Sequence, residues 1–473
     1  MTEYRPPHLS RCRRSDVEAD FVAAWNTTEA LFGSLKNEAA YLAVPEHGLR
    51  YPLIFYYGHA AVFYINKLLA AGLISEPVNR EFEDYFAIGV DEQSWDDMTK
   101  SERPWPSLEL LRHYREKVRE VVLGVIREHP LLAEGHAPIG DESPMWALFM
   151  AIEHERIHVE TSSMLIRELP LDHVKLPSGL PEIHGSAKLS SSSKPAVGRD
   201  FPASEWVQVP AGMVRIGKPP VWPAFGWDCE YGEKTANVPA FAASKFLASN
   251  GEFSEFVDAG GYEKSKYWSE EGWKWKEFRK AGAPAFWRKQ GQGWSLRTCF
   301  EEIPMAWSWP AVVNFHEAKA YAAWRSERDG CTYRLLGEAE HHRLRTLGDE
   351  RPVSHASWFG EGQTKTSPLY ANANFNLRVG SETPVDRFSR EPGVRTCDVF
   401  GNVWQWCEDK FEPLPGFKAH ALYPDYSTPS FDGKHQVVLG GSFMSTGEMT
   451  TPWTRSNFRP HFHQHAGFRL VKA

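Results

Sequence analysis

The spacing of apolar side chains in the first part of the chain most constrains its fold. Between residues 107 and 126, apolar or aromatic side chains recur in steps of three and four residues, which places them on one face of an α-helix. Ser107 directly precedes this pattern and is a suitable N-cap. The residues on the apolar face are Leu111, Tyr114, Val118, Val121 and Val125.

Three more segments of the same part of the chain have helical patterns. They cover residues 51–72, which Gly72 closes, residues 144–168, and, more weakly, residues 17–40. Ser143 is a candidate N-cap for the 144–168 helix, and proline is favoured at a first helical position. Four helices with fairly long connections indicate a four-helix bundle.

The character of the sequence changes after residues 185–204, which are rich in Ser, Gly and Pro. This composition predicts a linker or an exposed loop. Beyond it, short β-like pieces such as WVQVPAGMVRIG (206–217) alternate with loops rich in Gly, Pro and Trp, and one helical piece, NFHEAKAYAAWRSE, lies between them. We therefore expect an α+β protein with a helical domain at 1–184 and a loop-dominated domain at 205–473.

Composition excludes some classes of function. The chain has 473 residues, enough for two or three domains, and a formal net charge of −8. That charge argues against nucleic acid or a membrane surface as a partner. The six cysteines include no CxxC pair, the N-terminus lacks a signal-peptide pattern, and no apolar run approaches the length of a membrane span. A cytoplasmic protein with free thiols is expected.

The segment HERIHVE, residues 154–160, places His154 and His158 four residues apart on the predicted helix. Side chains at this spacing share a face. Small residues on the same stripe, Ala147 and Ala151, leave room beside the two imidazoles. The pair fits two core histidines satisfied by hydrogen bonds, and it also fits two metal ligands, so a third ligand is needed to choose.

Two residues are candidates for the third ligand. Glu160 would complete a two-histidine, one-carboxylate site, but it lies about 200° around the helix from His158 and faces away. His59 lies mid-helix among apolar and aromatic residues, where burying an imidazole without a partner is costly. A bundle interior brings such helices together, so His59, His154 and His158 are the predicted metal ligands. Three neutral imidazoles suit Fe(II), Zn(II) or Cu(II), and the residues alone do not choose.

Several long motifs, taken together, resemble one known family. LIFYYGHAAVFYINKL, GVDEQSWDDM and IEHERIHVET resemble the sulfoxide synthases of thiol-histidine biosynthesis, most closely the 5-histidylcysteine sulfoxide synthases of the ovothiol pathway. In the second half, VPAGMVRIG, VNFHEAKAYAAWR, YRLLGEAEHHRLR, VFGNVWQWCED, VLGGSF and HAGFRLV resemble the formylglycine-generating-enzyme domain. The resemblance extends over nearly the whole chain.

The resemblance implies a fold and a reaction. The fold is a DinB-like four-helix bundle with iron ligands at His59, His154 and His158, followed by a C-type-lectin-like domain of the formylglycine-generating-enzyme type that closes the pocket. The reaction uses Fe(II) and O2 to join cysteine to the imidazole C5 of histidine, which gives 5-histidylcysteine sulfoxide. Bond formation and sulfur oxidation each remove two electrons, and together they match the four that O2 accepts.

The chain departs from the family pattern where related enzymes have an active-site tyrosine. The segment after GNVWQW is CEDKFEPLPGF and contains no tyrosine. Without a proton donor, thiol dioxygenation to a sulfinate would compete, and a shifted substrate is an alternative, for example hercynine with another thiol or a selenium donor. The candidate substitutes for the donor are Tyr56, Tyr57, Tyr423 and Tyr426.

Other residues are candidates for substrate binding. A guanidinium group can bind a substrate carboxylate through two parallel hydrogen bonds. The family pattern places His461 near the pocket. If this segment were a strand, His461, His463 and His465 would share a face, and a second metal site there is an alternative. The arginines considered for substrate are Arg115, Arg455 and Arg459.

Two competing functions can be weighed against the synthase. A formylglycine-generating oxidase would need a cysteine pair before GFR, and residues 443–469 contain no cysteine. The other competing function is that of a non-catalytic lectin-like module on a metal-bearing bundle.

The expected partners are cysteine, histidine and O2. Because the sequence ends soon after GFRLV, N-methylation of a product is expected to need a separate methyltransferase.

Overall fold

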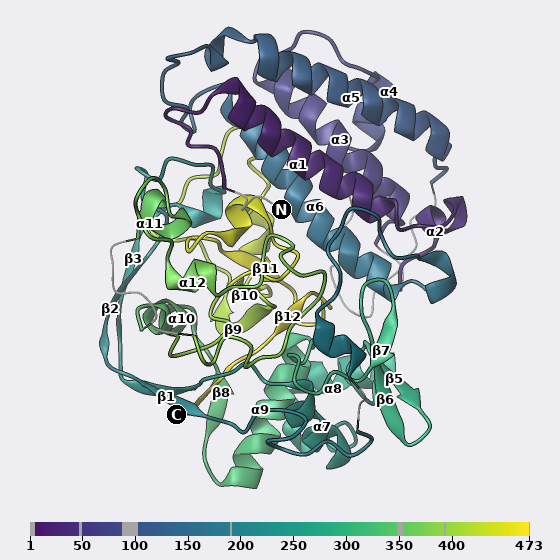
Figure 1. The fold of residues 1–473 in the computed structure, drawn as a ribbon, viewed down its shortest axis with the longest axis vertical. Coiled ribbons are helices and arrows are strands. Elements are labelled where there is room, and N and C mark those ends of the chain that lie inside the picture. The colour runs from purple at the N-terminus through teal and green to yellow at the C-terminus, as the bar shows by residue number, and fades with distance from the viewer. Residues whose placement is uncertain are drawn as a thin grey trace.

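A computed structural model describes residues 5–46, 50–87, 103–189, 192–347, 353–391 and 394–472. Long helices from the N-terminal third lie together on one side of the molecule, and the β-rich remainder lies on the other (Figure 1). The named strands of the described residues all follow the bundle in the chain, and the predicted α+β class is confirmed.

The N-terminal region is a four-helix bundle with two short additional helices. The long helices α1 and α3 each pack against both α5 and α6. Among the described residues, no helix has the length and apolar character to cross a lipid bilayer. The helices are α1 (Arg14–Phe32), α2 (Glu38–Leu42), α3 (Leu53–Ala70), α4 (Arg80–Tyr85), α5 (Leu108–Glu128) and α6 (Trp146–Glu168).

The helix boundaries test the sequence patterns. α5 begins as predicted, because the Ser107 side chain accepts a hydrogen bond from the amide of Leu110. α6 begins at Trp146, later than predicted, because residues 143–145 form a turn in which Ser143 accepts from the Met145 amide. The single helix expected over residues 17–40 is wrong. The chain leaves α1 after Phe32 and begins α2 only after Asn37, whose side chain caps it.

The C-terminal region contains short strands and helices. The predicted β-like piece at 206–217 forms two strands, and the predicted helix forms α9. The helices are α7 (Asn250–Asp258), α8 (Glu270–Arg279), α9 (Phe315–Asp329), α10 (Glu338–Arg345), α11 (His355–Phe359) and α12 (Pro368–Ala371). The strands are β1 (Trp206–Val209), β2 (Gly212–Ile216), β3 (Lys234–Val238), β4 (Phe241–Ser244), β5 (Trp287–Gln290), β6 (Gly293–Arg297), β7 (Glu302–Pro304), β8 (Tyr333–Leu335), β9 (Trp404–Lys410), β10 (Gln436–Leu439), β11 (Ser456–Phe458), β12 (Ala466–Gly467) and β13 (Leu470–Lys472).

Two four-stranded sheets organise this region. Their strand orders are β1-β4-β13-β8 and β11-β10-β9-β12. In the second sheet, β10 pairs antiparallel with β9, and the final pair, β9 with β12, is parallel, with Ala466 opposite Trp404. A bridge between Leu336 and Cys407 joins the two sheets. All six cysteines are free thiols.

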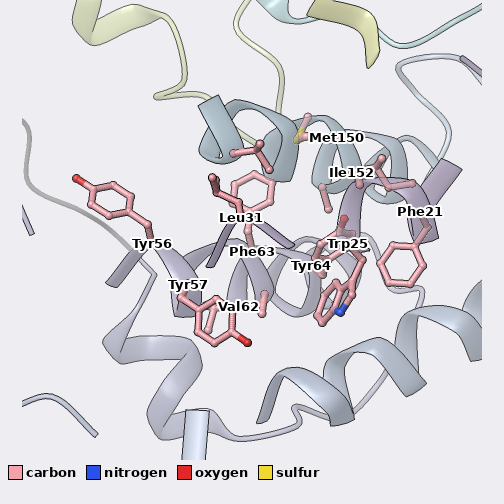
Figure 2. Close-up of a cluster of buried hydrophobic side chains, with 14 of the residues drawn as sticks. Phe21, Trp25, Leu31, Tyr56, Tyr57, Val62, Phe63, Tyr64, Met150 and Ile152 are labelled. Atoms are coloured by element: carbon pink, nitrogen blue, oxygen red, sulfur yellow. The ribbon is translucent and has the colours of Figure 1, made fainter. Parts of the chain in front are cut away.

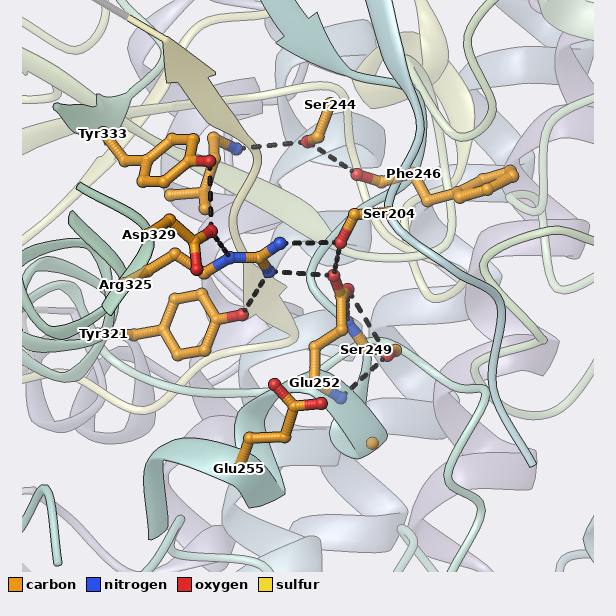
Figure 3. A network of polar contacts seen from close by, with 12 residues as sticks. Ser204, Ser244, Phe246, Ser249, Glu252, Glu255, Tyr321, Arg325, Asp329 and Tyr333 are labelled. Carbon is orange, nitrogen blue, oxygen red and sulfur yellow. Dashed lines mark hydrogen bonds and ion pairs between the residues drawn. The ribbon is translucent and has the colours of Figure 1, made fainter. Parts of the chain in front are cut away.

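The described part of the predicted linker, residues 185–204, packs against the C-terminal region. The indole Nε1 of Trp309 donates to Ser186 Oγ at 2.8 Å, and Phe201 is buried. At its end, Ser204 bonds Glu252 of α7 and accepts from Arg325 of α9, in the network drawn in Figure 3. The domain boundaries themselves stay predictions.

Gly58 of α3 allows a close contact that helps position its neighbour, His59. A Cβ built on Gly58 would lie 2.7 Å from Cε1 of Phe86. The Phe86 ring is fully buried and its carbonyl contacts Nδ1 of His59 at 2.7 Å. A side chain at position 58 would therefore move the residue that orients this imidazole.

We predict that Gly58→Ala destabilises the protein by about 1–2 kcal/mol. The overpacking cost exceeds the gain in helix propensity. Gly124→Ala is the matched control, because its new Cβ meets nothing within 4 Å, and it should stabilise by up to about 1 kcal/mol. Denaturant unfolding of both variants measures the difference. Equal stability of the two would show that Phe86 does not pack against α3 in this way.

Candidate metal centre

Three histidine side chains converge where α3 and α6 cross. One ring nitrogen from each of His59, His154 and His158 lies within 4.8 Å of the other two. The Nε2 atoms of His154 and His158 are 3.1 Å apart. The structure thus brings together the three ligands predicted from sequence, and their binding of a metal stays a prediction.

The surroundings of these rings fix their orientation. Nδ1 of His59 contacts the Phe86 carbonyl at 2.7 Å. A proton on Nδ1 in this contact would place the lone pair of the ring on Nε2. The ring of Phe63 stacks on His154 at 3.5 Å between centroids, and Phe55 stacks on His59 at 5.1 Å. Aromatic packing therefore holds both imidazoles from the side.

The cluster is built for neutral imidazoles. Burial, reinforced by the neighbouring histidines, lowers the pKa of both His154 and His158 far below the ordinary value. A neutral imidazole keeps the lone pair that a metal ligand needs.

The spacing also fits a metal ion. Two nitrogens each bound at about 2.1 Å and at right angles would lie about 3 Å apart, close to the 3.1 Å between His154 and His158. Two neutral imidazoles facing each other through Nε2 can make at most one hydrogen bond, whereas a cation between them would use both lone pairs. The donor set therefore fits a divalent transition metal.

The carboxylates of the HERIHVE segment face other partners, as helix geometry predicted for Glu160. Glu160 accepts from Trp404 Nε1 at 2.7 Å and from Ser445 at 2.9 Å, both in the C-terminal region. Glu155 accepts from Tyr64 at 2.6 Å inside the bundle. Neither carboxylate belongs to the histidine cluster.

The cluster borders a cavity of about 570 Å³ between the bundle and the C-terminal region. This volume suits small-molecule ligands. His59 and His158 line it from the bundle. From the C-terminal region it is lined by, among others, Trp227, Tyr423, Asp425, Tyr426, Arg455, Arg459 and Phe462.

Tyr56 and Tyr57 point to opposite sides of α3 (Figure 2). Tyr56 lines the cavity, and its ring centroid lies 5.9 Å from that of His158. Tyr57 points into the bundle and donates to Glu29 at 2.8 Å. Tyr57 is therefore corrected from a candidate donor to a bundle residue. Tyr56 lies three positions before His59 and Tyr57 only two, so helical spacing would have distinguished them.

Arg115 does not line the cavity either. Its guanidinium group is 1% exposed and pairs with Glu29 at 2.8 Å and with Glu155 at 3.5 Å. It also donates to the Tyr57 carbonyl at 2.8 Å. Its charge is balanced inside the bundle, so the expectation that it binds substrate is corrected.

Arg455 and Arg459 line the cavity, but each has a carboxylate partner. Nε of Arg455 donates to the buried Glu338 at 2.6 Å, and its other nitrogens donate to the carbonyls of Cys229 and Glu412. Arg459 pairs with Asp432 at 3.0 Å. Neither arginine presents an unbalanced positive charge to a substrate.

The histidines near the C-terminus do not form the expected strand, since residues 461–465 are irregular and β12 begins only at Ala466. His465 is buried and contacts Ser163 Oγ at 2.8 Å, whereas His463 lies beside Trp275. His461 lines a smaller neighbouring cavity of about 40 Å³. Within the described residues, no second group of metal-ligating side chains forms here.

Sequence reasoning missed two cations of the main cavity. Lys67 lies two helical steps of four from His59, and its Nζ lies 4.2 Å from the ring centroid of Tyr423. Burial lowers the pKa of Lys67 to about 8. Arg50 also lines the cavity and lies over the ring of Phe462. The spacing of eight residues from His59, on the same face of the helix, could have indicated Lys67. Nothing in the sequence singles out Arg50.

The motif GVDEQSWDDM lies outside the described residues.

Fold and site define a helical bundle with a three-histidine cluster, closed by a domain of mixed helix and sheet. The sulfatase-modifying factor enzyme 1-like domain matches residues 193–473, more than half of the chain, so the chain belongs to this family. The DinB superfamily matches residues 20–162. Both matches agree with the predicted fold.

Curated relatives are similar over part or most of the chain. The hercynine oxygenase of Mycobacterium tuberculosis is 33% identical over 52% of this chain and 55% of its own length. That of Mycolicibacterium smegmatis is 29% identical over 70% of this chain and 72% of its own. Ergothioneine biosynthesis protein 1 of Schizosaccharomyces pombe is 25% identical over 90% of this chain and 52% of its own. The chain thus spans about half the length of two of these relatives.

We predict that His154→Ala lowers the affinity for Fe(II) or Co(II) by at least about 100-fold, because one of three first ligands is lost. Anaerobic titration followed by metal analysis measures this without reference to activity. His113→Ala is the control, since this side chain is 69% exposed on α5, and it should bind metal as the wild type does. Unchanged affinity in His154→Ala would remove His154 from the ligand set.

Proposed function

We propose that this protein is an iron(II)- and O2-dependent oxidoreductase that joins a thiol sulfur to the imidazole ring of a histidine-derived substrate and oxidises the sulfur. The observation that carries the proposal is the cluster of three buried or half-buried imidazoles at the wall of a 570 Å³ cavity. Similarity to two hercynine oxygenases gives independent support.

Iron(II) held by His59, His154 and His158 would supply open coordination positions at which a thiolate and O2 react next to each other. The chain itself would bind and orient the organic substrates. Lys67 and Arg50 bring positive charge to the cavity, and a substrate carboxylate could pair with either. The aromatic rings of Tyr56, Phe63 and Tyr423 would exclude water from the reacting sulfur.

Two imidazole substrates compete, and hercynine is our first candidate. Its trimethylammonium group has no N–H donor and binds best against aromatic faces. Trp227, Tyr423, Tyr426 and Phe462 provide such faces in the cavity, and two relatives are hercynine oxygenases.

Histidine is the second candidate, with cysteine as the thiol and the C5 sulfoxide as product. The motif resemblance to the ovothiol synthases favours it. Asp425 lines the same cavity and could accept hydrogen bonds from a free ammonium group. The substrates in either case are small molecules.

Tyr423 is the proposed proton donor in place of the missing family tyrosine. Its ring centroid lies 6.2 Å from that of His154 and 5.2 Å from that of Phe63. Tyr426 stacks on Trp227 at 4.0 Å and is more deeply packed. Failure of the donor would leave thiol dioxygenation as the competing outcome.

The substrate assignment can be tested with the full chain loaded anaerobically with Fe(II). It is mixed with O2, cysteine and either hercynine or histidine, and the products are identified by mass and NMR. We expect a sulfoxide with a new carbon–sulfur bond, and a kcat/KM for hercynine above that for histidine. The reverse order would favour histidine. Cysteine sulfinate as the sole product would contradict the synthase proposal.

Tyr423→Phe should reduce sulfoxide formation by about 100-fold, the usual range for a lost proton donor, while sulfinate formation persists. The ratio of the two products, measured by mass spectrometry, reports this shift. Tyr57→Phe is the matched control, because its hydroxyl group bonds Glu29 away from the cavity, and it should keep the wild-type ratio. A wild-type ratio in Tyr423→Phe would exclude the donor role.

A further inference from the structure

A second cavity, of about 400 Å³, lies in the C-terminal domain, between α10, α11 and the loop before β11. Its lining residues include none of those around the histidine cluster. Nothing in the proposed reaction uses it.

The wall of this cavity carries positive charge. Four arginines line it, and among the described residues no aspartate or glutamate does. Arg215 has a partner, Glu233 at 2.8 Å, and both side chains of this pair are more than half exposed. Arg343 donates to the carbonyls of Pro210 and Ala211 and to Thr346, none of which is charged. The described part of the wall therefore carries more cations than carboxylates.

Arg345 is the central cation of this wall. It is 9% exposed. Its Nε donates to Nδ1 of His341 at 3.2 Å, and its Nη1 donates to the Pro452 carbonyl. Within the described residues, Nη2 has no hydrogen-bond partner and the group has no carboxylate partner.

Other buried arginines of the protein are balanced or widely bonded. Arg167 pairs with Glu382 at 2.6 Å, and Arg455 pairs with Glu338. Arg469 has no carboxylate, but it donates to four main-chain carbonyls and to Gln405. Among the described residues, Arg345 makes only two hydrogen bonds, and Glu338, the carboxylate that raises its pKa, is itself paired with Arg455. Burial lowers the pKa of Arg345 to about 9, so it is still charged at neutral pH.

Aromatic residues form the neighbouring wall. Phe400 lies 5.2 Å from the Arg345 guanidinium carbon and 5.0 Å from the ring centroid of Trp358. Trp358, Phe400 and Trp453 all line the cavity. A flat apolar body can pack against these rings.

We propose that this cavity is a binding site for a small organic anion, with a carboxylate or phosphate group on Arg345 and a flat ring against Trp358, Phe400 and Trp453. A guanidinium group with Nη2 unused matches an oxyanion in charge and geometry. His342, also in the wall, is buried and its pKa lies well below the ordinary value because of burial and Arg345. His342 is therefore neutral, and the positive charge of the wall comes from the arginines. Arg395, exposed at the rim, would add long-range attraction.

Calorimetric titration of the full chain tests the proposal, with phenyl phosphate, benzoate and phenol as probes. We expect phenyl phosphate or benzoate to bind with a stoichiometry of one, and phenol to bind at least about tenfold more weakly, since only the acids pair with arginine. Whichever of the two acids binds more tightly indicates whether the natural ligand carries a phosphate or a carboxylate group. Binding should weaken as salt is added. Equal binding of phenol, or no binding of either acid, would overturn the proposal.

Variants locate the site. Arg345→Gln should weaken binding of the acid by at least about tenfold. Because this variant also loses contacts to His341 and Pro452, Arg395→Ala provides a second test at an exposed residue and should weaken binding about threefold. Arg390→Ala, exposed and outside the cavity, is the matched control. Lys67→Gln, which removes a cation of the histidine cavity, should bind the acid normally. A loss of binding there would assign the anion to the histidine cavity and contradict the second site.

Discussion

The burial of α6 between two domains is the constraint on which the rest of the structure depends. This helix carries several carboxylates and yet is buried along most of its length. A buried carboxylate is tolerated only where donors compensate for the lost water. For Glu160 these donors come from Trp404, Ser442 and Ser445, and for Glu153 from the Glu448 amide and Arg156.

These contacts make the histidine cluster a property of both domains. His154 and His158 lie on the same helix as Glu160, so the hydrogen bonds that dock α6 onto the C-terminal domain also fix the histidine face toward α3. Burial raises the pKa of Glu160, and its three donors oppose that rise. The loops that provide these donors belong to the same domain as Tyr423 and Phe462, which close the cavity. The contacts that dock α6 onto the C-terminal domain therefore also bring together the two walls of the cavity.

Sequence periodicity predicted the helices and the convergence of the three histidines because both depend on local spacing. The four-residue step from His154 to His158 fixes their shared face, and the cost of burying His59 without a partner pointed to the same site. Periodicity failed where the chain turns, as after Phe32, and where a local pattern had no sheet partner, as at His461–His465.

Charge pairing was beyond prediction, because it depends on residues distant in the sequence. Arg115 and Arg455 are candidates for substrate binding by sequence, and each is neutralised by a carboxylate from another element. Arg345, which attracted no attention in the sequence, is a buried cation to which the described residues offer no paired carboxylate and only two hydrogen-bond acceptors.

The sequence by itself determined the α+β class, the bundle helices and the convergence of three imidazoles, since each follows from spacing within a helix and from the need to bury apolar faces. Only the tertiary structure decided which tyrosine faces the cavity, which arginines are already paired, and where a second cationic cavity opens. Those features depend on contacts between segments far apart in the chain, which no local pattern encodes.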